Sequence, residues 1–243
     1  MEARVLGSGG WLPTDLRETA CVYIRSGPEV LILDAGSGLR RLVTEPQLLD
    51  GVERISVVVS HFHLDHVVGV AALSGMELPR DVWMPARLLA GIPAGDLLER
   101  LVAAPFFTGT ERVATARELE GSTEIGPFRI EIRVQPQHPG RSIAIKVDGT
   151  LTYCTDTAFD AANVDFSRGS RILLHESFWG GDTTDDPGHT AAGEAGRLAA
   201  EAGVGRLVLM HVNPVGVDDE DLERSARAGF PAAEVGRDGL VLM

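Results

Sequence analysis

Short apolar runs, several of them rich in β-branched residues, recur along the chain and alternate with turns and helical patterns. The run at 55–59 is typical of a buried strand, because apolar residues fill it almost without interruption. Comparable runs predict further strands at 3–7, 21–24, 30–33, 128–134, 142–147, 151–153, 171–174 and 207–210. Helical patterns cover 66–74, about 86–103 and 190–203. We therefore expect an α/β protein.

The segment 76–112 differs from the rest of the chain. It carries four prolines, two adjacent phenylalanines and no strong strand pattern. This composition predicts an insert or lid over the core, with ordinary surface helix and loop as the alternative. We find no internal repeat or linker that would divide the chain, so we expect residues 1–243 to form one domain.

Composition narrows the classes of function. The 243 residues are 44% hydrophobic, which suffices for a packed core, and no apolar run approaches the length of a membrane helix. The net charge of −13 argues against a partner as long and polyanionic as nucleic acid. The first residues lack the layout of a signal peptide, and two cysteines, Cys21 and Cys154, give no disulfide framework. We expect a cytoplasmic protein.

Three of the seven histidines lie together, directly after the buried strand at 55–59. The cluster consists of His61, His63, Asp65 and His66. Imidazole nitrogens and carboxylate oxygens are ligands that Zn²⁺ and similar ions prefer. Alternation at the strand end can direct His61 and His63 to one side, while the following turn directs Asp65 and His66 to another. The cluster predicts two neighbouring metal ions.

Further candidates also occur at the ends of predicted elements. His138 lies in a loop between two strands, His211 follows the strand at 207–210, and Asp156 and Asp34 each end a strand. An isolated residue of this kind is more often a structural hydrogen-bonding group. Because the cluster needs ligands from elsewhere, we interpret His138, Asp156 and His211 as metal ligands.

These motifs resemble those of the metallo-β-lactamase-fold hydrolases, over nearly the whole chain. The resemblance rests on the His-x-His-x-Asp-His cluster, an Asp-x-Gly-Ser-Gly that begins at Asp34, and the spaced His, Asp and His. Within that superfamily, the segments 153–157, 174–177 and 188–192 are similar to the ribonuclease Z-like phosphodiesterase branch. The resemblance implies a four-layer αββα sandwich.

The resemblance also implies a role for each site residue. One divalent ion is held by His61, His63 and His138, and the other by Asp65, His66 and His211, with Asp156 bridging both. Asp34 is expected to orient a ligand histidine. Asp65 is expected to be a catalytic residue as well as a metal ligand. The ions are expected to be Zn²⁺, with Mn²⁺ as the alternative.

His189 and Glu176 are expected to supply a proton to the leaving group, since a histidine paired with a carboxylate is suited to that task. The alternative is that His189 or Thr190 merely caps a helix and that Glu176 is a surface carboxylate.

Two departures from the ribonuclease Z pattern change the expected substrate. Only 17 residues separate His138 from Asp156, which leaves no room for the arm that grips transfer RNA, and Phe178 stands where that branch has a threonine. We therefore expect hydrolysis of a small or cyclic phosphodiester by a hydroxide that bridges two metal ions. Phe106 and Phe107 are candidates for substrate binding, and the insert is a candidate surface for a homodimer.

Other functions stay open at this point. The same dimetal site suits hydrolysis of a thioester, lactone or lactam bond. A transfer-RNA 3′ endonuclease and a metal protein without catalytic activity are further, less favoured alternatives.

Overall fold

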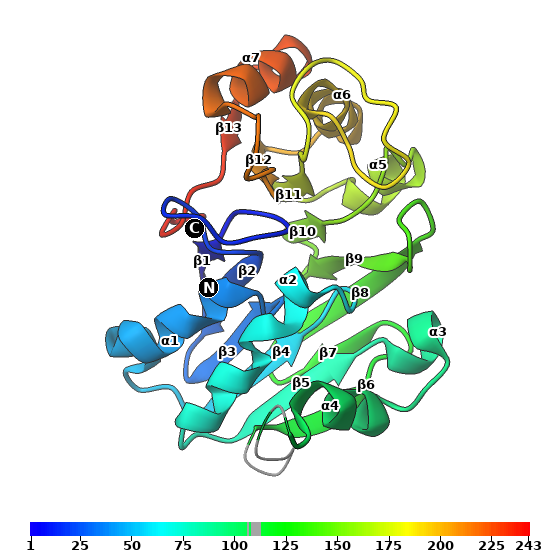
Figure 1. The fold of residues 1–243 in the computed structure, drawn as a ribbon. Helices are drawn as coiled ribbons and strands as arrows, with labels where there is room; N and C mark the ends of the chain where they lie inside the picture. The colour runs from blue at the N-terminus through cyan, green and yellow to red at the C-terminus, as the bar shows by residue number, and fades with distance from the viewer. Residues whose placement is uncertain (106, 108–112) are drawn as a thin grey trace.

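In the computed structural model, which describes residues 1–105, 107 and 113–243, two β-sheets pack face to face with helices on their outer sides (Figure 1). This is the predicted four-layer αββα sandwich. The N-terminal half of the chain forms one sheet and the C-terminal half forms the other.

Six strands form the N-terminal sheet: β1 (Glu2–Gly7), β2 (Cys21–Ser26), β3 (Glu29–Leu33), β4 (Arg54–Val58), β5 (Arg80–Met84) and β6 (Thr115–Glu118). They follow one another in chain order across the sheet. The strands from β1 to β3 pair antiparallel, and those from β3 to β6 pair parallel.

Seven strands form the C-terminal sheet: β7 (Thr123–Ile125), β8 (Phe128–Gln135), β9 (Ser142–Val147), β10 (Leu151–Cys154), β11 (Ile172–Glu176), β12 (Arg206–Met210) and β13 (Ala233–Val235). The strands from β7 to β10 are antiparallel, and those from β10 to β13 are parallel. Every strand that the sequence predicts is present, with bounds that differ by a few residues.

The core explains why the buried strands are apolar on both faces. In β3, Leu31 and Leu33 belong to the cluster between the two sheets, together with Ile145 of β9. The intervening Val30 and Ile32 pack instead under the helices on the outer side of the sheet. Because both faces of the sheet are covered, the strand shows no alternation of polar and apolar residues.

Among the described residues, the α-helices are α1 (Arg41–Thr44), α2 (Leu64–Val67), α3 (Ala86–Ala90), α4 (Ala94–Val102), α5 (Ala162–Ser167), α6 (Ala192–Ala202) and α7 (Asp219–Gly229). The predicted helix at 86–103 is divided into α3 and α4, because Gly91 adopts a φ of +70° and Pro93 follows it. In the described part of the chain, no helix has both the length and the apolar composition that crossing a membrane requires.

The segment 76–112 contains a strand, β5, that the sequence pattern does not predict. β5 pairs with β4 on one side and β6 on the other, so this part belongs to the sheet. Its pattern is hidden because Asp81 is buried, with ion pairs to Arg54 and Arg117. Phe107 is partly buried against the core of the N-terminal sheet, and Phe106 lies outside the described residues. A role as a lid stays a prediction.

Gly196 and Gly95 form a matched pair of helix glycines. A Cβ on Gly196 of α6 would lie 2.3 Å from the backbone oxygen of Ala226 in α7, whereas a Cβ on Gly95 of α4 meets no atom within 4 Å. We expect Gly196→Ala to lower the free energy of unfolding by about 1–3 kcal/mol, because α6 and α7 are forced apart. Gly95→Ala should leave it unchanged or raise it by up to about 1 kcal/mol. Urea unfolding measures the free energy of unfolding of both variants. An equal decrease in the two variants would contradict the packing argument.

Candidate metal centre

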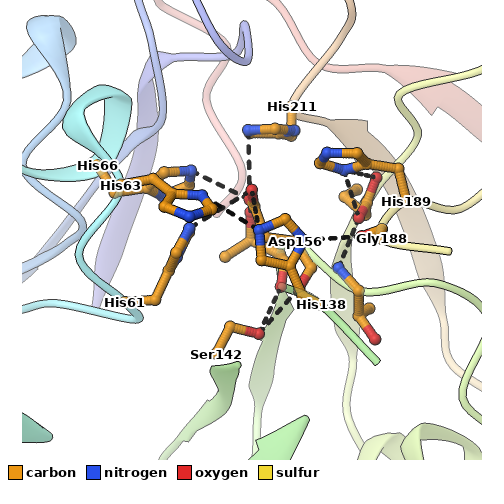
Figure 2. A network of polar contacts seen from close by, with 12 residues as sticks. His61, His63, His66, His138, Ser142, Asp156, Gly188, His189 and His211 are labelled. Carbon is orange, nitrogen blue, oxygen red and sulfur yellow. Dashed lines mark hydrogen bonds and ion pairs between the residues drawn. The ribbon is translucent and has the colours of Figure 1, made fainter. Parts of the chain in front are cut away.

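The predicted ligands come from the ends of four strands and converge on one place (Figure 2). The histidine cluster follows β4, His138 follows β8, Asp156 follows β10 and His211 follows β12. The packing of one sheet against the other brings the end of β4 to the ends of strands in the second sheet. All seven residues that the sequence analysis names as ligands lie in this centre.

A first group of donor atoms belongs to His61, His63, His138 and Asp156, and these atoms lie within 4.8 Å of one another. His63 Nδ1 is 3.1 Å from His138 Nε2, and His61 Nε2 is 3.5 Å from Asp156 Oδ2. Three imidazoles and one carboxylate oxygen are a suitable donor set for a divalent metal.

A second group is formed by Asp65, His66 and His211. Asp65 Oδ2 lies 3.1 Å from His211 Nε2 and 3.4 Å from His66 Nε2. Both histidines are almost fully buried. The group is therefore compact and largely removed from solvent.

Asp156 lies between the two groups and faces each with a different oxygen. Its Oδ1 is 3.0 Å from His66 Nε2 and 3.2 Å from His211 Nε2. Its Oδ2 is 3.5 Å from His61 Nε2 and 3.7 Å from His138 Nε2. This arrangement suits a carboxylate that bridges two cations.

Two buried ring atoms show that the centre fits a metal. Among the described residues, the Nε2 atoms of His61 and His66 are buried and have no hydrogen-bond partner, although Asp156 lies near both. Burying a polar atom without a partner is costly, so such atoms call for an explanation. Coordination of a cation supplies the missing interaction.

The electrostatics of the centre are strongly coupled. Burial raises the pKa of Asp156, but the charges of His211, His66 and His61 outweigh burial and hold that pKa well below its usual range. Burial lowers the pKa of His66, yet Asp156 and Asp34 raise it well above the ordinary value. Burial and the charge of His66 lower the pKa of His61. The carboxylates around His66 thus favour its protonated form, whereas binding of a cation would favour its neutral form.

Asp34 holds His66 from behind. Its Oδ2 lies 2.7 Å from His66 Nδ1 and accepts hydrogen bonds from the hydroxyls of Ser60 and Tyr153, each at 2.8 Å. Its Oδ1 accepts from the Ser60 backbone at 2.6 Å. These contacts fix the orientation of the imidazole and direct Nε2 toward Asp156.

Backbone strain is concentrated at the same strand ends. Asp34, Asp156 and His211 adopt φ values of +59°, +46° and +53°, in the left-handed region that non-glycine residues avoid. Each of them directly or almost directly follows a strand. Strain of this kind persists where the surrounding structure enforces it, which is common at functional sites.

His189 and Glu176 form a pair beside the second group. Glu176 ends β11 and is fully buried, and its Oε1 lies 3.1 Å from His189 Nδ1. It also accepts hydrogen bonds from the backbones of Thr157 and Thr190. The interpretation of Glu176 as a surface carboxylate is therefore wrong. The cap alternative is wrong too, because Ala191 is the N-cap of α6.

The charge state of His189 follows from this pairing. Burial alone would lower its pKa, but the hydrogen bond and the charge of Glu176 raise it to about 9. The ring lies 5.5 Å from that of His211 and 4.4 Å from that of Phe178, measured between centroids. A protonated imidazole is thereby held next to the metal centre.

Sequence reasoning missed three residues around the centre. The backbone N–H of Trp11 donates to Asp65 Oδ2 at 2.8 Å, and Phe178 stacks on His189. Asp186 accepts hydrogen bonds from the backbones of Gly188 and His189 and so holds their loop. Two of them gave a signal: Phe178 stands where the ribonuclease Z-like branch has a threonine, and Asp186 begins the turn sequence Asp-Pro-Gly.

A comparison with protein families now identifies the chain. Residues 30–212, well over half of it, match the model of the beta-lactamase superfamily domain. The chain belongs to the beta-lactamase superfamily. With its His/Asp centre, it is a metal-dependent hydrolase of the metallo-β-lactamase fold.

Two curated relatives align with nearly the whole of this chain. The probable metallo-hydrolase YhfI of Bacillus subtilis is 28% identical over 238 residues, which cover 95% of this chain and 94% of the relative. Ribonuclease Z of a Synechococcus strain is 28% identical, covering 99% and 97%. That alignment spans 313 positions against a chain of 243, so the ribonuclease carries segments without a counterpart here.

Solved structures show the same fold. The crystal structure of B. subtilis YhfI superimposes with a TM-score of 0.82 at 23% identity, over 99% of this chain and 98% of that one. A diphosphatase of the PhnP family gives 0.72 at 18% identity, over 100% and 97%. Human tRNase Z, short form, gives 0.65 at 18%, over 100% and 99%.

Asp156 should be required for metal binding, because it faces both groups of donors. We expect Asp156→Ala to bind divalent metal at least about 10-fold more weakly than the wild type. Metal content after dialysis against Zn²⁺ or Mn²⁺, measured by mass spectrometry, tests this. The control is Asp160→Ala, which removes another buried carboxylate that pairs with Arg133 outside the centre. Full metal content in Asp156→Ala would contradict the assignment.

Proposed function

We propose that this hydrolase cleaves a small or cyclic phosphodiester and holds two divalent ions, Zn²⁺ or alternatively Mn²⁺. The observation that carries the proposal is the His189–Glu176 pair beside a centre in which the seven expected ligands form two groups; His189 itself also lies within reach of Asp156 and His211. Hydrolysis of a phosphodiester needs a nucleophile, neutralisation of charge on the phosphoryl oxygens and a proton for the leaving group. Divalent ions in such a centre supply the first two requirements when bound.

His189 supplies the third requirement. Its Nδ1 faces Glu176, so Nε2 is the ring atom that can deliver a proton to the departing oxygen. Water loses one proton to solvent and its oxygen forms the new bond to phosphorus, the ester P–O bond breaks, and the proton of His189 neutralises the alkoxide; His189 then takes up a proton from solvent. Glu176 keeps the imidazole protonated and oriented until that step.

The surroundings of the centre support a small substrate with a single negative charge. A cavity of about 120 Å³ opens on the centre, lined by Trp11, His63, Asp65, Asp156, Phe178, His189 and His211. Among the described residues, no Lys or Arg lines it, and the chain carries a net charge of −13. A long polyanion would lack the basic surface that it needs.

A substrate panel tests the proposal. We expect the metal-loaded protein to hydrolyse bis(p-nitrophenyl) phosphate and cyclic nucleotides faster than thioesters, lactones or β-lactams. Product formation is followed by absorbance for the chromogenic substrates and by ³¹P NMR for the cyclic ones. Turnover of an acyl substrate with inert diesters would overturn the proposal in favour of the acyl-hydrolase alternative.

The role of His189 is tested by varying the leaving group. We expect His189→Ala to keep its metal but to slow hydrolysis of an alkyl diester by roughly 10²–10⁴-fold, the usual contribution of a general acid. Hydrolysis of a p-nitrophenyl diester should slow much less, since p-nitrophenolate departs without a proton. The control is Asp185→Ala, an exposed carboxylate in the same loop. Equal slowing of both substrates would contradict the assigned role.

A further inference from the structure

Trp11 exposes a large aromatic ring at the mouth of the metal centre. The residue is 58% exposed and lines the same cavity as His63, His189 and His211. A single exposed apolar side chain is ordinary on a protein surface, so it is the position of Trp11 at this cavity that calls for an explanation. The cavity itself, at about 120 Å³, is smaller than the roughly 300 Å³ typical of sites that enclose a whole ligand. The groups attached to the phosphate must therefore lie outside it, against the rim.

The backbone of Trp11 is strained in a way that a smaller residue would avoid. Its φ is +60°, and the N–H of Leu12 donates to the carbonyl of Gly10 at 2.7 Å, which closes a three-residue turn around it. Such turns are rare and strained, and glycine would adopt this conformation freely. The chain nevertheless places its largest side chain here. Strain that is tolerated beside a catalytic centre points to a function for the side chain.

The loop that carries Trp11 is fixed to the metal centre. The N–H of Trp11 donates to Asp65 Oδ2, and Gly10 donates to the backbone of Val212 at 3.0 Å. A Cβ on Gly10 would lie 2.5–2.7 Å from atoms of the His211 ring, so the loop packs directly on that ligand. The backbone that carries the indole is thereby held at a fixed place relative to the donors.

The charges of the residues that line the cavity limit the kind of group that can bind beside Trp11. Within the described residues, no cationic Lys or Arg side chain lines the cavity to bind a further phosphate. An exposed indole instead recognises flat rings, because stacking buries both faces and is tolerant of the ring's identity.

We propose that Trp11 determines substrate specificity by stacking on a planar aromatic group of the diester, as in a nucleoside cyclic phosphate. This inference rests on the proposed phosphodiesterase activity and adds the chemical class of the substrate.

Two five-membered cyclic diesters that differ in the aromatic group test it. Wild type, Trp11→Gly and Trp11→Phe are compared on adenosine 2′,3′-cyclic phosphate and on glycerol 1,2-cyclic phosphate. We expect Trp11→Gly to lower kcat/KM for the adenosine substrate by roughly 5- to 100-fold, mainly through KM. The glycerol substrate should change less than about 2-fold, and Trp11→Phe should recover most of the loss. All variants keep the N–H that contacts Asp65.

The neighbouring Leu12 provides a matched control. It is exposed and does not line the cavity, so Leu12→Ala should behave as wild type on both substrates. Trp11→Gly should also unfold at the same or a higher temperature than wild type, because glycine relieves the strain at this φ. Equal losses on both substrates would mean that Trp11 acts through Asp65, and would overturn the inference.

A binding measurement separates the inference from the proposed function. By calorimetry, wild type should bind adenosine 5′-monophosphate more tightly than ribose 5-phosphate, and Trp11→Gly should lose that preference. If this holds while no diester is hydrolysed, the proposed function fails and the aromatic subsite stands. If wild type shows no preference between the two ligands, or Trp11→Gly keeps it, the inference fails whatever the activity.

Discussion

The contact of one carboxylate with two sets of imidazoles is the interaction on which this structure depends. Asp156 is buried, and a buried anion is stable only where charge and hydrogen bonds surround it. His66 of α2 and His211 after β12 approach one of its oxygens, and His61 after β4 and His138 after β8 approach the other. The sandwich is therefore more than a scaffold, because only its two-sheet packing brings these strand ends to the same carboxylate.

The centre and the His189–Glu176 pair are parts of one hydrogen-bonded unit. His138 Nδ1 lies 2.9 Å from the carbonyl of Gly188, the residue before His189 (Figure 2). Asp186 ties both residues of this loop through their N–H groups, and Glu176 holds the ring of His189. The loop that orients a ligand of the first group thus also sets the position of the imidazole beside the second. A substitution that moves this loop should therefore change the positions of both His138 and His189.

Local patterns let the sequence predict most of the strands and the seven expected ligands that meet in the centre, because strand runs and the histidine cluster are short-range features. What depends on distant contacts was not predictable. β5 was hidden by Asp81, whose burial makes sense only with Arg54 and Arg117 from the strands on either side. Trp11 gained its position from a hydrogen bond to Asp65, 54 residues away. The burial of Glu176 likewise arises from the packing of a loop over a strand end.

The absence of Lys and Arg from the described cavity lining has a consequence for turnover. Hydrolysis of a diester produces a monoester, which takes on a second negative charge near neutral pH. No Lys or Arg in the described lining would hold that second charge, so the product would be retained only by the bound cations and by the imidazole of His189. The rate at which the product leaves would therefore depend on which metal occupies the centre.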